Sequence, residues 1–385
     1  MVIMKIKILF PIGMFYPTSI GGPSNTVYWH TCFLTRNNVE NYIVTTDCKL
    51  DINKHNIPLD TWIKNEAGQI IYCKTKFQFF PVYAWYQTLK HIFKVDLIHY
   101  SSAYHYLTIY TILFSLLLKK KIVLSPRGEF FENAIDSFAK RIVLKFYSLF
   151  QYKLLFHATS KEENEEILKL FPRAKVVIQP NFIQMNTTTK TVIKSRNIVF
   201  LGIIYGVKKI ENILDALAIS KQFNLGNNKF LIAGKPLVKR DFAYKIMLEK
   251  KIEDLNLADK VEFVGEIFGK EKEMFLNEAY VLMLPSESEN FGNVVVESLS
   301  QSTPVIASKG TPWSILKEYD AGWWVSNDPL SLSQTIDEAL LLSQEEYLEK
   351  CRNSLNLVNR KFDINLSIEN QWIKIYEDLK LLQTN

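Results

Sequence analysis

Short runs of consecutive apolar residues alternate with longer segments of helical periodicity along most of the chain. Apolar strands that lie between helices are typical of parallel sheets covered on both faces. The first half has expected strands at Ile6–Pro11, Tyr42–Asp47, Asp96–Ser101, Lys121–Gly128 and Val176–Phe182, a helix at Pro23–Thr35, and a strand followed by a Ser160-capped helix within Leu154–Phe171.

The second half begins the same alternation again after Met185–Arg196, a polar stretch that is interpreted as a linker. Its expected strands are Asn197–Gly202, Lys229–Gly234, Val261–Gly265, Tyr280–Ser286 and Pro304–Ser308. This pattern predicts an α/β protein with two doubly wound, Rossmann-like domains, at 1–185 and 186–366, and ligands at the carboxyl ends of their strands. In the final segment, 367–385, an amphipathic pattern predicts a helix (Ser367–Leu382) that packs back on the first domain.

Charge is distributed unevenly over the 385 residues. Residues 1–185 carry 22 Lys and Arg against 13 Asp and Glu, whereas the remainder carries 24 against 27. The four cysteines have neither disulfide nor metal-ligand spacing, which indicates a reducing cytoplasm. The first residues resemble a strand rather than a signal peptide, and no apolar run reaches the roughly 18 residues of a membrane span. We therefore expect a cytoplasmic protein, either free or peripheral on the inner face of the plasma membrane.

The segment Pro285–Trp313 carries the strongest chemical signal. Glu289 and Glu297 flank Phe291-Gly292-Asn293, which is interpreted as a loop turning into a helix. Gly292 allows a close backbone approach, and the amides of Asn293 and Val294 at a helix N-terminus suit a diphosphate. One carboxylate then reaches a sugar beyond the phosphates, and the other holds ribose hydroxyls. The simpler alternative is a pair of solvated helix glutamates.

This segment resembles the E-x7-E signature of glycosyltransferase family 4, the retaining GT-B enzymes. The string SENFGNVVVES…TPVIAS…TPW…GWWV resembles the branch that builds bacterial surface polysaccharides. The resemblance covers nearly the whole chain and is specific from Gly202 to Val325. It implies two Rossmann-like domains that face each other across a cleft, a nucleotide-sugar donor, and retention of anomeric configuration.

Further site residues follow from the resemblance in the first half. Gly21-Gly22 matches the family's glycine loop at the donor phosphates and acceptor, and His99 matches a histidine that contacts the donor sugar. Arg127 matches the arginine of a PRG element, which could pair with a phosphate or an acidic acceptor. The alternatives are an ordinary turn at Gly21-Gly22, a strand-end histidine with ordinary hydrogen bonds at His99, and a surface salt bridge at Arg127.

In the second half, Lys208 matches the lysine that neutralises the donor diphosphate, while Gly234, Gly265 and Ile267 match positions around the nucleobase. The chain departs from the family at Ile203, where an arginine is expected. It also departs at Lys209, where the family has glycine, and at Asn181-Phe182, where the family usually has Asn-Gly.

No D-x-D motif is present, so the resemblance implies a metal-independent enzyme without a cofactor. Cations and a helix N-terminus would hold the diphosphate instead. Glu289 would orient the sugar and, with Lys208, His99 and Arg127, form the catalytic set. Lys209 or Arg127 could compensate for the arginine that is absent at position 203.

Aromatic and lysine side chains interleave over Lys74–Lys94 and again between Tyr100 and Lys121. This pattern fits docking on an anionic membrane surface next to a lipid-linked acceptor, or an aromatic core with solvated lysines. No nucleic-acid-binding module is recognisable.

The leading hypothesis is a retaining glycosyltransferase that adds one UDP- or GDP-linked sugar to a lipid-linked oligosaccharide for O-antigen or capsule. The alternatives are a GT-B sugar-nucleotide epimerase and, because of Ile203, a degenerate transferase that acts as a nucleotide-sugar-binding or scaffold subunit.

Overall fold

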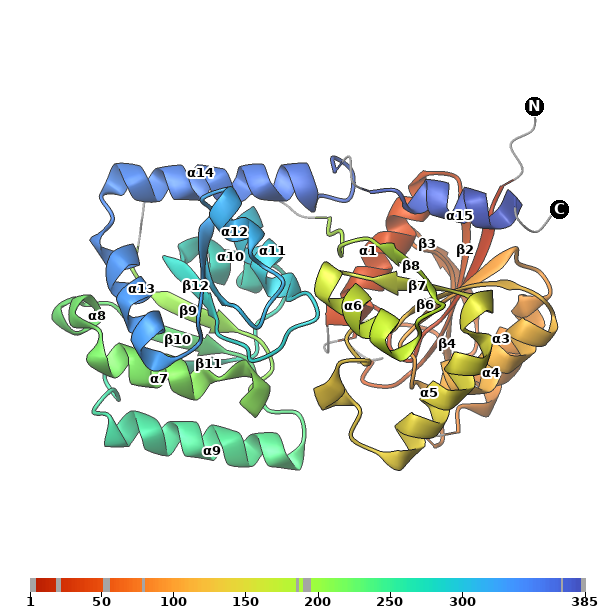
Figure 1. Cartoon of the computed structure of the whole chain (residues 1–385), viewed down its shortest axis with the longest axis horizontal. Helices are drawn as coiled ribbons and strands as arrows, with labels where there is room; N and C mark the ends of the chain where they lie inside the picture. Colours follow the sequence, from red (N-terminus) through yellow and green to blue (C-terminus); the bar gives the residue numbers. More distant parts are fainter. Residues whose placement is uncertain are drawn as a thin grey trace. The chain divides into compact units, whose positions relative to one another are not determined.

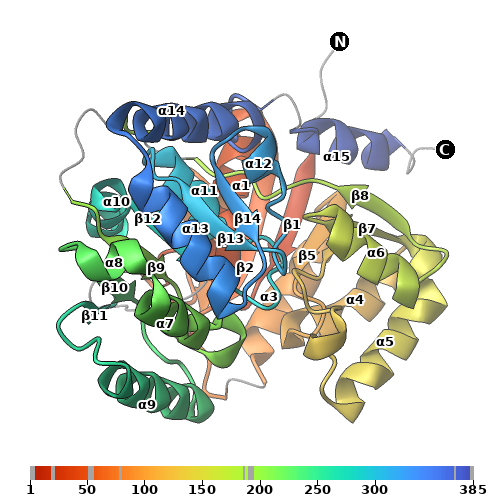
Figure 2. The ribbon, with the colours of Figure 1, turned by 60° about the vertical axis from the view of Figure 1, so that its left-hand side comes forward.

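The computed structural model describes residues 5–18, 22–50, 56–77, 80–184, 187–189, 195–367 and 370–381. The chain divides into two compact units. The first comprises Met1–Gln184 together with Ser367–Asn385, and the second comprises Met185–Leu366. Each unit has one sheet with helices on both faces (Figures 1 and 2). The prediction of two doubly wound α/β units is therefore confirmed.

The sheet of the first unit has the strand order β3-β4-β2-β1-β5-β6-β7-β8. Every neighbouring pair is parallel except β3 and β4, which form an antiparallel hairpin at one edge. The bounds are β1 Lys7–Pro11, β2 Glu40–Thr46, β3 Trp62–Asn65, β4 Gly68–Cys73, β5 Leu97–Ser101, β6 Lys121–Ser125, β7 Leu154–Ala158 and β8 Lys175–Ile178.

Helices cover both faces of this sheet (Figure 1). One face carries α1 (Gly22–Arg36) and the C-terminal helix α15 (Trp372–Leu381), so the last helix belongs to the first unit. The other face carries α3 (Val82–Ile92), α4 (Tyr106–Leu117), α5 (Phe138–Phe150) and α6 (Lys161–Leu170). Buried residues of these four helices share one apolar cluster with strand residues such as Ile98 and Leu124. The Ser160 cap is confirmed, because its side chain accepts from the Glu163 amide.

The second unit has a six-stranded sheet of order β11-β10-β9-β12-β13-β14, in which all pairs are parallel. Its strands are β9 Ile198–Leu201, β10 Phe230–Ala233, β11 Val261–Gly265, β12 Val281–Leu284, β13 Val305–Ser308 and β14 Gly322–Val325. One face is covered by α7 (Ile210–Ile219), α9 (Lys239–Asp254) and α13 (Pro329–Leu341), and the other by α10 (Gly269–Glu278), α11 (Asn293–Ser300) and α14 (Gln344–Lys361) (Figure 1).

Four strands differ from the sequence-based expectation. The β3–β4 hairpin and β14 were not predicted as strands. The strand expected at Val176–Phe182 ends at Ile178, because Pro180 has no amide hydrogen to donate to a ladder. Among the described residues, no helix is long and apolar enough to span a bilayer.

Candidate functional site

The second unit brings together Lys208 and Glu289, two of the predicted site residues. Lys208 ends a short 3-10 turn, Gly206–Lys208, that follows β9, and Glu289 lies in the loop after β12. Lys208 Nζ lies 2.5 Å from Glu289 Oε2, and the Ser286 hydroxyl donates to the same oxygen at 3.2 Å. The two charged side chains are only 12% and 17% exposed. A shielded ion pair therefore stands at the carboxyl ends of two adjacent strands.

The electrostatics keep Lys208 cationic. Burial alone would lower its pKa, but the neighbouring charge of Glu289 and the hydrogen bond to it outweigh burial and raise the pKa. The ammonium also lies 5.8 Å from the centre of the Tyr205 ring, which is a favourable position for a cation. A fixed positive charge at a strand end can stabilise a bound anion.

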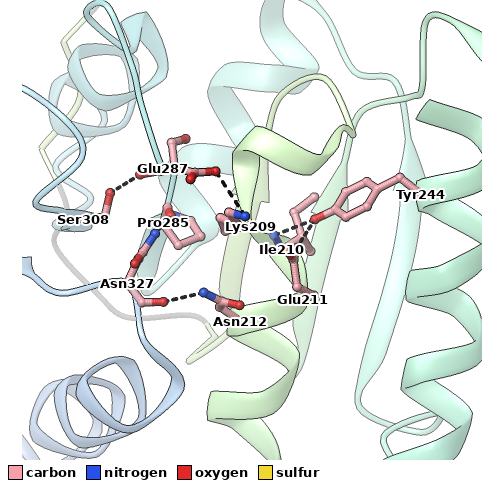
Figure 3. Close-up of polar contacts among 10 residues, drawn as sticks. Lys209, Ile210, Glu211, Asn212, Tyr244, Pro285, Glu287, Ser308 and Asn327 are labelled. Carbon is pink, nitrogen blue, oxygen red and sulfur yellow. Dashed lines mark hydrogen bonds and ion pairs between the residues drawn. The ribbon is translucent and has the colours of Figure 1, made fainter. Parts of the chain in front are cut away.

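Lys209 occupies the position where the family resemblance predicts glycine. Its φ of 51° and ψ of 41° place it in the left-handed region, which glycine adopts without strain. The backbone here therefore has a conformation that suits glycine, although the residue is lysine. Its ammonium forms an ion pair with Glu287 Oε2 at 3.1 Å (Figure 3). Lys209 thus adds a second cation next to Lys208.

Hydrogen bonds brace the start of α7 from several elements (Figure 3). The Tyr244 hydroxyl of α9 accepts from the Ile210 amide at 2.9 Å and donates to Glu211. The Asn212 side chain donates to the Asn327 carbonyl at 2.6 Å, and the Asn327 side chain donates to the Pro285 carbonyl at 3.3 Å. Contacts from α9 and from the loops that contain Asn327 and Pro285 therefore fix the position of the turn that carries Lys208 and Lys209.

The loop before α11 has the turn that the sequence predicted. Gly292 has a φ of 78°, and a Cβ added there would lie 3.0 Å from Leu284 Cδ2. α11 begins at Asn293, so the amides of Asn293 and Val294 lie in its first turn, where helical amides have no intrahelical acceptor. The Phe291 ring is buried 5.2 Å from the Trp313 ring, and Trp313 Nε1 donates to the Phe291 carbonyl. Phe291 therefore shapes the loop through core packing.

Glu297 is buried in α11 and is not a solvated helix glutamate. Lys272 of α10 donates to its Oε1 at 2.7 Å. Among the described residues, Oε2 of Glu297 has no hydrogen-bond partner. Sequence reasoning missed Lys272, because nothing in the lysine-rich α10 sequence distinguishes it from solvated neighbours.

Three glycines line the carboxyl ends of β9, β10 and β11. A Cβ at Gly234 would lie 1.8 Å from the Gly202 carbonyl oxygen, so this position requires glycine for packing. Gly265 has a φ of 80° with open space around its Cα, and the buried Ile267 follows it. The half-buried Ile203 lies directly after Gly202 and supplies no charge.

The predicted glycine pair is only partly described. Gly21 lies outside the described residues, while Gly22 is the first residue of α1. Nothing in the structure assigns a ligand to either glycine.

His99, in the middle of β5, lies in a buried chain of hydrogen bonds within the first unit. Its Nδ1 is 2.6 Å from the Tyr376 hydroxyl of α15, and its Nε2 is 2.6 Å from the Ser125 hydroxyl. The chain continues from Tyr376 to His30 Nε2 at 2.8 Å and from Ser125 to His157 Nδ1 at 2.7 Å. Both ring nitrogens of His99 are thus engaged by neighbouring side chains.

All three rings of this chain are neutral at neutral pH. Burial, with the nearby charge of Arg127 as a smaller cause, lowers the pKa of His157 to about 3. Burial likewise places the pKa values of His30 and His99 well below the ordinary value. The Trp372 ring of α15 packs against all three imidazoles. Sequence reasoning missed His157, although HATS, like IHYS, places a histidine near a strand end.

Arg127 follows β6 in a left-handed conformation with a φ of 53°. Its Nε donates to the Ser101 hydroxyl at 2.6 Å, and its Nη1 donates to the Asn181 side-chain oxygen at 2.9 Å. Burial lowers the pKa of Arg127 to about 10, so it stays charged at neutral pH. Both of these hydrogen-bond partners, Ser101 and Asn181, are neutral, so Arg127 does not form the surface salt bridge considered as an alternative. Among the described residues, no cluster of His, Cys, Asp and Glu could hold a metal ion.

Parts of the chain are similar in sequence to known glycosyltransferases. Residues 188–355, which make up most of the second unit, match the family model described as Glycosyl transferases group 1. The O-antigen chain mannosyltransferase RfbU of Salmonella typhimurium is 38% identical over 65 residues, which are 17% of this chain and 18% of the relative. A second relative, from Campylobacter jejuni, is 24% identical over 212 residues, which are 54% of this chain and 55% of the relative. This relative is an alpha-1,4-N-acetyl-D-galactosaminyltransferase that acts on an undecaprenol-linked glycan.

The alignments thus cover less than two thirds of either curated relative. Among solved structures, HepE of Anabaena in complex with UDP and glucose superimposes with a TM-score of 0.74. The two are 16% identical over 97% of this chain and 99% of HepE. At this identity the likeness shows the fold, which is of the GT-B class.

Proposed function

We propose that the chain is a retaining, metal-independent glycosyltransferase of family 4. It would transfer a sugar from a UDP- or GDP-linked donor to a lipid-linked glycan during synthesis of O-antigen, capsule or a related polysaccharide. The family match over residues 188–355 and the activities of the two relatives support this proposal. The observation that carries it is the shielded ion pair between Lys208 and Glu289, beside the turn at Gly292.

The donor diphosphate would take the place of Glu289 as the partner of Lys208. Lys209 and the first-turn amides of α11 would supply further positive charge, in the way that helix N-termini bind phosphates. The ribose hydroxyls would bond Glu297 Oε2, while Lys272 holds Oε1 and fixes the carboxylate. The strand-end backbone at Gly234, Gly265 and Ile267 would surround the base.

In the proposed reaction, the acceptor hydroxyl attacks the anomeric carbon from the face that the phosphate leaves. A bond forms between the acceptor oxygen and the anomeric carbon, and the bond to the phosphate oxygen breaks. The acceptor proton passes to the departing phosphate, so no protein base is required. Glu289, released from Lys208, would orient the sugar and stabilise positive charge that develops at the anomeric carbon. His99 remains a predicted contact of the donor sugar, and Arg127 remains a predicted partner of a phosphate or an acidic acceptor.

Ile203 supports a second candidate, a subunit that binds the nucleotide-sugar without turning it over. An aliphatic side chain at this strand end removes one cation that would stabilise the leaving diphosphate. A sugar-nucleotide epimerase is a third candidate, which would interconvert the donor sugar without an acceptor.

Calorimetry and nucleotide release over a panel of UDP- and GDP-sugars test these candidates. We expect one donor to bind and to release nucleotide, with release accelerated by a polyprenyl-diphosphate-linked glycan. Lys208→Gln should lower the rate by about 100-fold, the usual effect of losing one preorganised charge. Lys251→Gln, which removes a lysine paired with Asp215 at 2.7 Å between α9 and α7, is the matched control and should leave the rate unchanged.

Each other outcome identifies a different function. Binding without release, even with acceptor, would support the binding subunit. A change of the sugar on the intact donor would support the epimerase. An absence of binding to every donor would reject all three.

A further inference from the structure

The outer layer of the first unit has an unusual composition. The three helices α3, α4 and α5 contain no Asp or Glu, although all three have solvent-exposed faces. α4 lies between α3 and α5 in both views of the ribbon (Figures 1 and 2). α3 and α4 also pack directly, with the Trp85 and Tyr110 rings 4.4 Å apart. The three helices therefore form one surface.

α4 has no charged residue and is apolar on both faces. Its inner face is buried through residues such as Ile112 and Leu116. Its outer face exposes large apolar side chains: Tyr110, Leu113, Phe114 and Leu117. A helix that is apolar all round is normally buried, so the outer face of α4 is expected to have a further contact.

α5 adds a stripe in which apolar and basic residues alternate. Phe138, Arg141, Ile142, Lys145 and Leu149 are all exposed and recur at intervals of one, three or four residues, so they lie along one side of the helix. The opposite side packs into the core through Val143, Leu144, Phe146 and the fully buried Tyr147. The core contacts of α5 therefore do not account for the apolar residues in its exposed stripe.

Exposed cations surround these apolar side chains. They are Lys90 and Lys94 at the end of α3, Lys119 after α4, and Arg141 and Lys145 on α5. None of these five forms an ion pair with another residue in the described part of the chain. In the sequence, Glu132 and Asp136 precede α5, and Asp136 is paired with Lys140 at 2.8 Å.

We propose that the exposed face of α3, α4 and α5 docks on an anionic lipid bilayer. Apolar side chains would enter the boundary between headgroups and acyl chains, and the flanking cations would bind lipid phosphates. A second copy of the chain fits this face less well, because a symmetric pairing would bring two basic surfaces together. Helix α6, which carries the exposed Glu162 and Glu165, marks the side where this basic surface ends.

This inference rests on the proposed function, since a bilayer is where a lipid-linked acceptor is found. It also locates the surface more narrowly than the sequence did. Within Lys74–Lys94, residues such as Ala84, Thr88 and Ile92 belong to the core, so part of that segment is the aromatic core considered as the alternative. α5, which no sequence pattern had singled out, carries the strongest combination of apolar and basic side chains.

Sedimentation with vesicles tests the proposal without any catalytic readout. The full chain should bind vesicles of 30% phosphatidylglycerol in phosphatidylcholine and should bind pure phosphatidylcholine much more weakly. Arg141→Gln with Lys145→Gln should weaken binding to the anionic vesicles about 30-fold, from about 1 kcal/mol for each cation near such a surface. Phe114→Ser with Leu117→Ser should weaken binding about tenfold or more to both vesicles.

Matched controls exist on α9 of the second unit. Phe242 and Ile246 are 55% and 65% exposed, compared with 47% for Phe114 and 68% for Leu117. Lys239 and Lys250 are exposed cations on the same helix. Serine at the first pair, or glutamine at the second, should leave vesicle binding unchanged.

Several results would overturn the proposal. One is an equal loss of vesicle binding in the α9 variants, and another is vesicle binding that depends on neither lipid charge nor salt. A third is a wild-type dimer that the α4 and α5 variants convert to a monomer. Nucleotide binding measured on the same variants separates this test from the proposed function. A failure of membrane docking would leave donor binding intact.

Discussion

The Tyr376 hydroxyl lies 2.6 Å from Nδ1 of His99, and this contact belongs to a buried histidine chain whose hydrogen bonds all run in one direction. His157 Nε2 lies 2.8 Å from the Gln179 carbonyl, which can only accept, so Nε2 carries the proton. Ser125 must then donate to His157 Nδ1 and accept from His99 Nε2. Tyr376 in turn donates to His99 Nδ1 and accepts from His30 Nε2.

Nitrogen NMR should therefore find His30, His99 and His157 all neutral and all protonated at Nε2 at pH 7.5. Tyr376→Phe removes the donor to His99 Nδ1 and the acceptor for His30 Nε2 together. Because each buried unpaired group costs about 1–3 kcal/mol, we expect the first unit to lose about 2–5 kcal/mol of unfolding free energy. Tyr147→Phe in the same unit, which loses the bond from its hydroxyl to the Ala103 carbonyl, should cost less. Mixed tautomers in the wild type would contradict the directed chain.

Acid should destabilise the first unit before the second. The folded pKa values of these three histidines lie below the unfolded value of about 6.5, so their stabilising effect is complete above that pH and is lost as pH falls below it. Each contributes a slope of about 1.4 kcal/mol per pH unit. All six histidines of the chain lie in the first unit. Hydrogen exchange between pH 7 and 4.5 should show peptides of the first unit losing protection first, and simultaneous loss would argue against this linkage.

Substitutions of Glu289 and Glu297 should change different steady-state parameters. Glu289→Gln removes the carboxylate that would stabilise charge in the transition state, so kcat should fall about 100-fold or more with little change in KM. Glu297→Gln should instead raise the donor KM about tenfold, the effect of losing hydrogen bonds to a charged group. Lys272→Gln should follow Glu297→Gln, because it frees the carboxylate that it holds. Unchanged kinetics in the two glutamate variants would reject the assignment.

Lys209 offers a test of backbone strain. Glycine and alanine at this position both remove the ion pair with Glu287, but only glycine also removes the Cβ that disfavours the left-handed conformation. Lys209→Gly should therefore be more stable than Lys209→Ala by about 1 kcal/mol in urea unfolding. Both should weaken donor binding to a similar degree, since both lose the same cation. A more stable alanine variant would show that the backbone can relax.

The sequence predicted most strands of both sheets because short apolar runs between helical segments have few other structural solutions. It also placed Gly292 before a helix, where a left-handed residue precedes α11. The β3–β4 hairpin escaped prediction because β3, WIKN, has no apolar alternation over its four residues. Lys272 and Tyr376 escaped for another reason. Their importance arises from partners 25 and 277 residues away, Glu297 and His99, and one sequence contains no record of such pairs.

The return of α15 to the first unit has a consequence for biosynthesis. Residues 372–381 are translated after the whole second unit, yet Trp372 and Tyr376 cover His30, His99 and His157. Until they leave the ribosome, the first sheet has neither the hydroxyl that joins two of its histidines nor the indole that shields all three from water. The first unit, although synthesised earlier, therefore reaches its final buried state only after the last helix has emerged.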